Sequence, residues 1–290
     1  MAFSLRPAAR KLRLIGETII FRHTVFSFPI AVSAILLETS GHPPVREVVL
    51  ILLAATAGRN AANAMNRVID ADIDRQNPRT AGRHLPAGTL SKKSLVVFSL
   101  AMGVVLTVCA FLLNPLCAIL LPVAGIMIIG YSFAKRFTWL CHYWLGVACA
   151  IAPMGAFLGL TGAFEFRFFV LAAAHALWVA GFDIIYARLD IDFDRRTGIH
   201  SIPARFGDKG ARAFAAVSHV GTAACWFLIP MFWTLSFWYY IAAGIAAALL
   251  VAEHVVSIVN SERRVKIASY SINEVVPLVL LAGVVLGVYL

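Results

Sequence analysis

Charged side chains are scarce in this chain. They make up 14% of its 290 residues, whereas hydrophobic residues make up 60%, and the mean hydropathy is +0.82. These values lie outside the range of soluble globular proteins, and no stretch of ordinary polarity is left over for a soluble domain. We therefore predict an integral membrane protein in which residues 1–290 form a single membrane-embedded domain.

Cysteine is also scarce, and none of the five cysteines occurs in the Cys-x-x-Cys spacing of zinc and redox sites. All five lie within, or at the edge of, apolar stretches. This pattern argues against disulfides and a zinc centre, and it favours burial in apolar surroundings. The cysteines are Cys109, Cys117, Cys141, Cys149 and Cys225.

Apolar stretches of about 20 residues are long enough to cross the roughly 30 Å hydrocarbon layer of a membrane as helices. The sequence contains nine such stretches, so we predict an all-α polytopic protein with nine transmembrane helices. The predicted spans are residues 17–38, 48–68, 94–113, 116–134, 138–160, 167–188, 211–231, 236–259 and 271–290.

The basic residues sort by loop instead of clustering with aromatic residues, so the net charge of +10 does not indicate nucleic-acid binding. Alternate loops hold nearly all of them, and the remaining loops hold only Arg46 and Arg167. The positive-inside rule then places the N-terminus in the cytoplasm and the C-terminus outside. We expect a multi-pass protein of the inner membrane, with residues 3–15 lying on the lipid surface as a basic amphipathic segment.

The pattern Asp-x-Asp-x-Asp-Arg occurs twice, 120 residues apart, and each copy follows an apolar stretch. Two carboxylates about 4 Å apart repel by roughly 1 kcal/mol in water and about 4 kcal/mol near a protein surface. We therefore expect a cation at each copy, and the predicted topology places both copies at the cytoplasmic face. The copies are Asp70, Asp72, Asp74 and Arg75, and Asp190, Asp192, Asp194 and Arg195.

Helical spacing puts most of these carboxylates on two polar stripes that extend into the predicted spans. Steps of 4, 3, 4 and 4 residues in segment 59–88, and of 3, 4 and 4 in segment 183–207, keep side chains on one helix face. Asp72 and Asp192 lie off the stripes, where we expect them to orient the ligands or to be solvated. The stripes are Arg59, Asn63, Asn66, Asp70 and Asp74, and Asp183, Tyr186, Asp190 and Asp194.

The stripes offer hard oxygen ligands without histidine or cysteine, which predicts magnesium instead of zinc or copper. The loops between the spans supply cations, and a diphosphate can both bridge magnesium ions and accept hydrogen bonds from arginine. We therefore predict a magnesium–diphosphate site. Its predicted metal ligands are Asn66, Asp70, Asp74, Asp190 and Asp194, and its cations are Arg79, Arg83, Lys135, Arg136, Arg195 and Arg205.

Arg22 and Arg59 lie well inside predicted spans, where a charge costs about 2.5 to 3.5 kcal/mol. Each needs a partner, which is either a buried acid or backbone carbonyl, or the carboxylate of a bound substrate. Arg188 lies at the end of a span instead, and we expect it to be an interfacial anchor that reaches toward water.

Three segments resemble, in the same order, the motifs of one family. They are RNAANAMNRVIDADIDRQNPRTAGRHLPAG at residues 59–88, YSFAKRFTWLCHYWLG at residues 131–146, and DIIYARLDIDFDRRTGIHSIPARFG at residues 183–207. The first resembles an NxxxDxxxD motif with its following basic loop, and the last resembles a DxxYAxxDxxxD motif. Over nearly its whole length, the chain resembles the UbiA superfamily of membrane prenyltransferases.

The resemblance implies a nine-helix bundle around a central cavity, with Mg²⁺ at its cytoplasmic mouth holding the diphosphate of a polyprenyl donor. It implies that the catalytic carboxylates are Asp70, Asp74, Asp190 and Asp194. It also implies diphosphate contacts from Arg79, Lys135, Arg136 and Tyr186, and a second layer of support from Asn63 and Asp183. Arg59, together with Arg22, would bind an aromatic carboxylate acceptor, so the implied reaction is prenyl transfer in quinone biosynthesis.

The first span, FRHTVFSFPIA, resembles the start of the menaquinone-pathway enzymes of the futalosine branch. On this ground 1,4-dihydroxy-6-naphthoate is the favoured acceptor and 4-hydroxybenzoate the alternative, because both combine a phenolic ring with a carboxylate. Arg67 and His84 depart from the usual ubiquinone-type motif, which bears on the acceptor and not on the reaction class.

Two other classes of membrane protein share single features with this chain. A secondary transporter also carries intramembrane charges, but its ionisable residues approach the bilayer midplane, whereas these aspartates gather at one face. A CDP-alcohol phosphotransferase also has paired carboxylates, but its DGxxAR segment is absent from the sequence.

Overall fold

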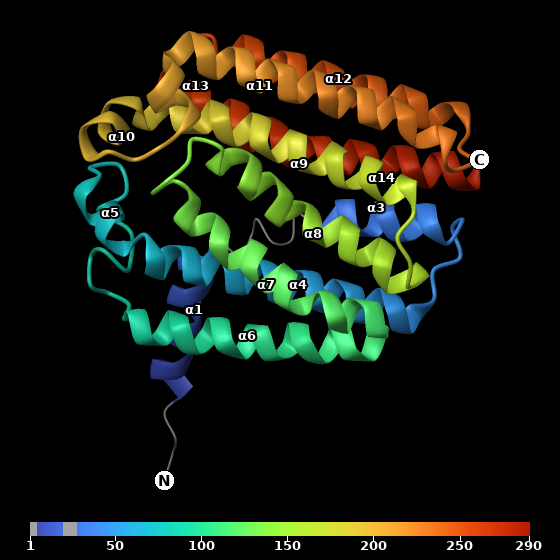
Figure 1. Ribbon diagram of the computed structural model, residues 1–290, viewed down its shortest axis with the longest axis horizontal. Helices are drawn as coiled ribbons and strands as arrows, with labels where there is room; N and C mark the ends of the chain where they lie inside the picture. Colours follow the sequence, from blue (N-terminus) through green and yellow to red (C-terminus); the bar gives the residue numbers. More distant parts are fainter. Residues whose placement is uncertain (1–4, 20–27) are drawn as a thin grey trace.

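A computed structural model describes residues 5–19 and 28–290, and these residues form a bundle of roughly aligned helices (Figure 1). Within them, eight helices are long and apolar enough to cross a membrane, the last being α14 together with the two short helices before it. The long helices are α4 (Val45–Ile69), α6 (Lys92–Leu113), α7 (Pro115–Ala134), α8 (Cys141–Thr161), α9 (Phe166–Ala187), α11 (Ile202–Leu228), α12 (Phe237–Val256) and α14 (Asn273–Tyr289).

Shorter helices join these spans or extend them. They are α1 (Leu5–Thr18), α3 (Phe28–Glu38), α5 (Ala71–Gln76), α10 (Ile191–Thr197) and α13 (Glu262–Lys266), two 3₁₀ turns at Arg188–Asp190 and Ile229–Met231, and a π-helical turn at Ile267–Ile272.

The predicted all-α membrane architecture is confirmed, and eight of the nine predicted spans correspond to long helices. The first predicted span, residues 17–38, is seen only in part: α1 ends at Thr18, α3 covers Phe28–Glu38, and residues 20–27 lie outside the described part. The predicted span 211–231 begins earlier, at Ile202, because the Ser201 hydroxyl caps the helix by accepting from the Ala204 amide. Because the first residues of this helix are polar, the apolar pattern did not reveal where it starts. Gly207, with φ of 71°, kinks the helix.

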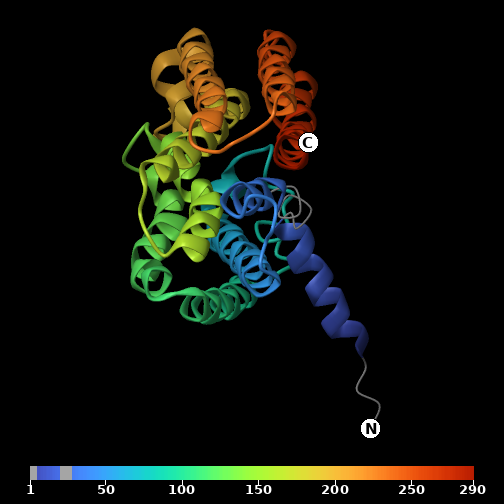
Figure 2. The same cartoon turned by 90° about the vertical axis from the view of Figure 1, so that its right-hand side faces the viewer.

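Consecutive long helices pack as neighbours, and α3 closes the bundle by contacting α14, α4 and α8. Seen along the helices, α1 leaves the bundle at an angle (Figure 2). The backbones of α8 and α9 approach so closely at Gly146 that a Cβ there would lie 2.2 Å from the Ala176 carbonyl oxygen. This contact brings the start of α8 close to the middle of α9.

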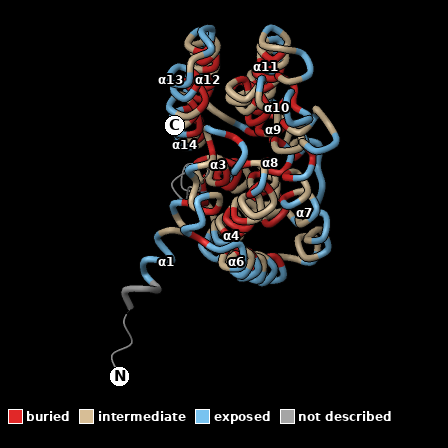
Figure 3. The backbone as a smooth tube through the Cα atoms, turned by 90° about the vertical axis from the view of Figure 1, so that its left-hand side faces the viewer, coloured by how far each residue is buried: buried red, intermediate tan, exposed pale blue. Residues whose placement is uncertain are grey.

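The outer face of the bundle is apolar, as lipid contact requires. On α6, exposed side chains follow one another at helical spacing, and exposed segments cover the periphery in Figure 3. Its exposed residues include Leu100, Val104, Val108 and Phe111.

Arg46 and Arg167, the two arginines in the loops that otherwise lack basic residues, both have structural partners. Arg46 donates to the Leu112 carbonyl at the end of α6 over 2.6 Å, and Arg167 contacts the Glu38 carboxylate at 2.8 Å. The Arg167 guanidinium also lies over the ring of Trp233. These two arginines therefore tie helix ends together at the end of the bundle away from the aspartates.

The expectation for Arg188 was wrong. Its side chain is buried, its Nε donates to Asp208 Oδ1 over 2.7 Å, and its Nη1 donates to the Ser257 carbonyl over 2.7 Å. Because both partners are distant in sequence, the apolar pattern around Arg188 gave no sign of them. The residue joins the end of α9 to α11 and α12 instead of reaching toward water.

Candidate active site

The first acidic segment keeps its stripe although α4 ends within it. Asp70 follows the last residue of α4 with φ of −90° and ψ of 0°, and α5 begins at Ala71. Helical hydrogen bonds continue across the break, from the Asp70 amide to Asn66 and from the Asp74 amide to Asp70. Asn66, Asp70 and Asp74 therefore stay on one side of the chain.

The second acidic segment has a similar break. α9 ends at Ala187, a 3₁₀ turn covers Arg188–Asp190, and α10 carries Asp194. In both segments the carboxylates lie where a long helix bends into a short one, at the same end of the bundle (Figure 1).

The two segments face one cavity of about 840 Å³. Nearly all the predicted site residues line it, so the structure brings both stripes together. Arg136 contacts the site through Asp70 instead, and Arg22 lies outside the described residues. The predicted cations Arg195 and Arg205 do not line the cavity, because Arg195 Nε donates to the Ala204 carbonyl over 2.8 Å and the Arg205 guanidinium lies over the Trp139 ring. The predicted residues that line the cavity are Arg59, Asn63, Asn66, Asp70, Asp74, Arg79, Arg83, Lys135, Asp183, Tyr186, Asp190 and Asp194.

Asp70 is almost completely buried and is held by three side chains. Lys135 Nζ and Asn66 Nδ2 donate to Oδ2 over 2.7 and 2.8 Å, and Arg136 Nη1 lies 3.4 Å from Oδ1. The predicted cations of the middle motif segment, residues 131–146, therefore neutralise the first acidic segment.

Asp74 pairs with Arg83, whose Nη1 lies 2.8 Å from each carboxylate oxygen. Arg67 Nη1 lies farther away, at 3.9 Å from Oδ2. Arg83 belongs to the same motif loop as His84, so this loop folds back over the carboxylate that precedes it.

Asp190 joins the two acidic segments. Arg79 donates to both of its oxygens, and Asn77 Nδ2 donates to Oδ1 over 2.9 Å. Arg79 Nη1 also donates to the Tyr186 hydroxyl over 2.6 Å. Burial lowers the pKa of Arg79, but its hydrogen bonds to Asp190, together with the electrostatic effects of Tyr186, Asp190 and Tyr270, outweigh burial and raise that pKa above its ordinary value. The guanidinium therefore stays charged beside Asp190.

The carboxylate oxygens of the two acidic segments fit a magnesium site only together with further ligands. Within residues 5–19 and 28–290, no group of three or more His, Cys, Asp and Glu side chains is close enough to hold a metal ion by itself. Magnesium is commonly bound by one or two carboxylates, with waters and substrate phosphates completing its octahedron. Two separate carboxylate pairs on one cavity match that mode of binding.

Deeper in the cavity the walls become mostly apolar. From Asp70 back to Ile51, both of which line it, α4 rises about 28 Å. The cavity therefore extends along most of the length of a span. Its apolar lining includes Met127, Ile128, Leu145, Met154, Phe168 and Phe182.

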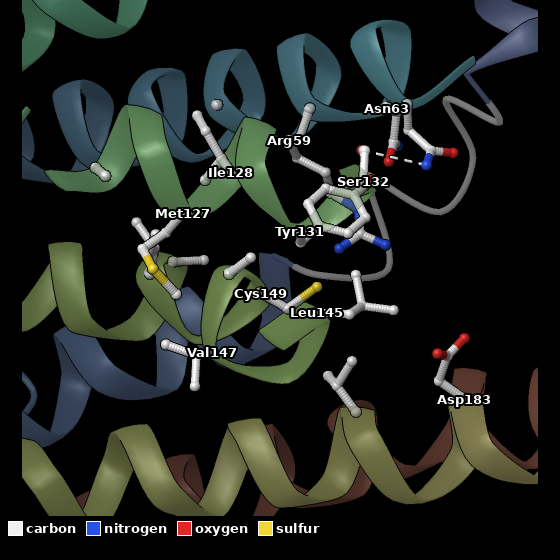
Figure 4. A pocket seen from close by; sticks show the side chains of 18 of the residues that line it. Arg59, Asn63, Met127, Ile128, Tyr131, Ser132, Leu145, Val147, Cys149 and Asp183 are labelled. Carbon is white, nitrogen blue, oxygen red and sulfur yellow. Dashed lines mark hydrogen bonds between the residues drawn. The ribbon is translucent and has the colours of Figure 1, made fainter. Parts of the chain in front are cut away.

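Arg59 reaches from α4 into the cavity beside Tyr131 and Cys149, and Asp183 points into the cavity from α9 (Figure 4). Among the described residues Arg59 forms no ion pair, and its buried Nε has no hydrogen-bond partner. An ion pair with a buried acid is thus not seen there, which leaves the guanidinium available to an anion in the cavity.

Asn63 and Asp183 have partners that spacing could not reveal. Asn63 Nδ2 donates to the Ile19 carbonyl over 3.1 Å, and Asp183 Oδ2 lies 2.7 Å from His142 Nδ1. Sequence reasoning missed Asn77, His142 and also Ser201, which donates to Asp194 Oδ2 over 2.8 Å. All three lie inside the motif segments, so those segments were the one available signal.

Comparisons with known proteins agree with this architecture. The model of the UbiA prenyltransferase family matches residues 26–275. A 4-hydroxybenzoate octaprenyltransferase of Vibrio campbellii is 27% identical over 95% of this chain and 94% of its own length. A 4-hydroxybenzoate solanesyltransferase of Synechocystis is 30% identical over 89% of this chain and 88% of its own.

Solved structures show the same fold. The apo structure of a UbiA homolog from Aeropyrum pernix K1 is 32% identical, with a TM-score of 0.83 over 91% of this chain and 98% of that one. A UbiA homolog from Archaeoglobus fulgidus bound to GPP and Mg²⁺ is 18% identical, with a TM-score of 0.64 over 94% of this chain and 99% of that one. The chain belongs to the UbiA prenyltransferase family and is a membrane-embedded transferase.

Proposed function

We propose that the protein transfers a polyprenyl group from a polyprenyl diphosphate to 4-hydroxybenzoate, with Mg²⁺ as cofactor. The observation that carries the proposal is the division of one cavity into an acidic, cation-lined end and a long apolar end, with Arg59 between them. A lipid diphosphate has the matching division, and Arg59 offers a site for the acceptor's carboxylate.

The charge at the acidic end supports a metal requirement. Four carboxylates there face five cations, so the walls alone hold little surplus positive charge for a multiply charged diphosphate. When bound, Mg²⁺ would supply that charge and stabilise the departing diphosphate. The carboxylates are Asp70, Asp74, Asp190 and Asp194, and the cations are Arg67, Arg79, Arg83, Lys135 and Arg136.

The protein's own residues then have separate tasks. Arg79, Lys135 and Arg136 lie where they can donate to the diphosphate once it replaces their carboxylate partners. As the carbon–oxygen bond of the donor breaks, its electron pair leaves with the diphosphate and an allylic cation remains. The apolar lining excludes water, and ring faces such as that of Tyr186 attract the positive charge.

The acceptor lies between Arg59 and Asp183 in this proposal. Arg59 binds the carboxylate, and Asp183 accepts a hydrogen bond from the ring hydroxyl, which makes the ring more electron-rich. A ring carbon then forms the new carbon–carbon bond, and the ring proton passes to an oxygen of the released diphosphate or of a carboxylate at the acidic end. Arg22 stays a proposed second contact to the acceptor.

The choice of acceptor changes from the one that the first span favoured. The reported curated relatives are named for 4-hydroxybenzoate, and they match this chain over most of its length. We therefore place 4-hydroxybenzoate first and 1,4-dihydroxy-6-naphthoate second. Membership of a prenyltransferase family also sets aside the transporter and the CDP-alcohol phosphotransferase.

The test combines purified protein, Mg²⁺, a polyprenyl diphosphate and the two acceptors in competition, with products identified by mass. We expect a product that contains the prenyl group and 4-hydroxybenzoate, and none when Asp70→Asn or Asp190→Asn replaces the wild type. Normal turnover by both folded variants would contradict the role of the acidic end, and preferential prenylation of the naphthoate would overturn the acceptor.

The proposal includes the placement of the protein. The distribution of lysine and arginine supports an inner-membrane protein with nine spans and the acidic end toward the cytoplasm. A cysteine introduced at exposed Arg196 should react with a membrane-impermeant maleimide in inside-out vesicles and not in intact cells.

A further inference from the structure

His142 links the cavity to the start of α11. It is the second residue of α8 and is almost completely buried, with 4% of its side chain exposed. Its Nδ1 lies 2.7 Å from Oδ2 of Asp183, whose side chain is 28% exposed and lines the cavity. Both residues line the cavity, but the Asp183 carboxylate is by far the more exposed of the two.

The hydrogen bond made by Nε2 of His142 determines whether Nδ1 carries a proton. The Ile202 amide donates to His142 Nε2 over 3.4 Å, so Nε2 must present its lone pair. In the neutral ring the proton then resides on Nδ1, which donates to Asp183. This arrangement holds the carboxylate through one oxygen and leaves Asp183 Oδ1 free of any hydrogen bond seen among the described residues.

The same turn of chain also holds one of the proposed metal ligands. Ser201 immediately precedes Ile202 and donates to Asp194 Oδ2 over 2.8 Å. The neighbouring His200 amide donates to the Lys135 carbonyl over 2.8 Å, which fixes this turn against the motif segment 131–146. The start of α11 therefore sets the positions of Asp194 and, through His142, of Asp183.

We propose that His142 is a positioning residue for acceptor recognition: its Nδ1–H holds Asp183 so that the free carboxylate oxygen meets the acceptor's hydroxyl. This inference rests on the proposed function. Within this pair the histidine is almost completely buried, whereas the carboxylate is partly exposed and faces the cavity opposite Arg59 (Figure 4).

The test compares two substitutions of similar size. In His142→Asn the side-chain amide can take the place of Nδ1–H and donate to Asp183, whereas His142→Leu fills the space without a donor. Tyr143→Phe is the matched control, because Tyr143 bonds Ser218 on the far side of the helix from the cavity lining. Prenylation kinetics and the affinities for 4-hydroxybenzoate and benzoate are measured for each protein.

We expect His142→Leu to lower kcat with 4-hydroxybenzoate by about 10-fold to 100-fold, with the KM for the polyprenyl diphosphate changed by less than about threefold. It should also lose the wild-type preference for 4-hydroxybenzoate over benzoate in binding, because that preference measures recognition of the hydroxyl. His142→Asn should restore most of both properties, and Tyr143→Phe should match the wild type.

A double-variant comparison decides the case even if His142→Leu folds poorly. If His142 acts through Asp183, adding His142→Asn or His142→Leu to Asp183→Asn should change kcat by less than about twofold. Full additivity, an unchanged preference for the hydroxyl in His142→Leu, or equal losses in the Asn and Leu variants would overturn the inference. Product formation by the wild type tests the proposed function separately, so the two can fail independently.

Discussion

Replacing Arg59 should make the protein more stable and less active at the same time. A guanidinium inside a span costs about 2.5 to 3.5 kcal/mol, and within the described residues the buried Nε of Arg59 has no hydrogen-bond partner that would offset this. Because the side chain is half-buried beside the cavity, we take about half of that cost as recoverable. Arg59→Leu should therefore raise the free energy of unfolding by about 1 to 2 kcal/mol.

The same change should weaken the use of the acceptor. A charged pair between Arg59 and a carboxylate in a water-poor cavity is worth about 2 to 4 kcal/mol when one partner is removed. At 1.4 kcal/mol per factor of ten, kcat/KM for 4-hydroxybenzoate should fall by about 30-fold to 700-fold. The KM for the donor should stay within about threefold, because the donor's diphosphate is proposed to bind at the acidic end.

The assay pairs thermal unfolding in detergent with initial rates at varied acceptor concentration. Arg59→Lys serves as the control. It keeps the positive charge but lacks the planar guanidinium that can donate two hydrogen bonds to one carboxylate, so it should lose less activity. The reasoning fails if Arg59→Leu lowers the unfolding temperature, which would make Arg59 a structural ion-pair residue. It fails equally if the acceptor kinetics of Arg59→Leu match those of the wild type.

Three further changes test other parts of the account. Arg79→Lys keeps the positive charge but cannot donate to Asp190 and the Tyr186 hydroxyl at the same time, as the guanidinium does. The kcat/KM for the polyprenyl diphosphate should therefore fall by about 10-fold or more in steady-state assays. Arg188→Leu should lower the free energy of unfolding by about 2 to 3 kcal/mol in denaturant titrations, since it leaves the Ser257 carbonyl unpaired; unchanged stability would contradict the role assigned to this residue. Chelation with EDTA should abolish both turnover and the thermal stabilisation by a non-reactive diphosphate analogue, and excess Mg²⁺ should restore both; stabilisation that survives chelation would show that the diphosphate binds without metal.

The long helices could be predicted closely because their signal is local. Apolar runs of span length need no knowledge of partners, so α7, predicted at 116–134, is found at Pro115–Ala134. The carboxylate stripes were predictable for the same reason, since spacing of three and four residues survives even the break at Asp70.

What escaped prediction depends on contacts between distant parts of the chain. Asn77 bonds Asp190 across 113 positions, and the partners of His142 lie on α9 and at the start of α11. Arg188 was misjudged because its neighbours in sequence are apolar, while its polar partners lie on α11 and beyond α12. Spacing within one helix carries no information about these partners.

The central claim is that both acidic segments hold metal and diphosphate in a single site. The most direct measurement is pulsed EPR of Mn²⁺, which shares the oxygen preference of magnesium, on protein with a bound diphosphate analogue. We expect ³¹P coupling to the metal in the wild type, with fewer Mn²⁺ ions so coupled in both Asp70→Asn and Asp190→Asn. Undiminished ³¹P coupling in either variant would contradict a site built from both segments.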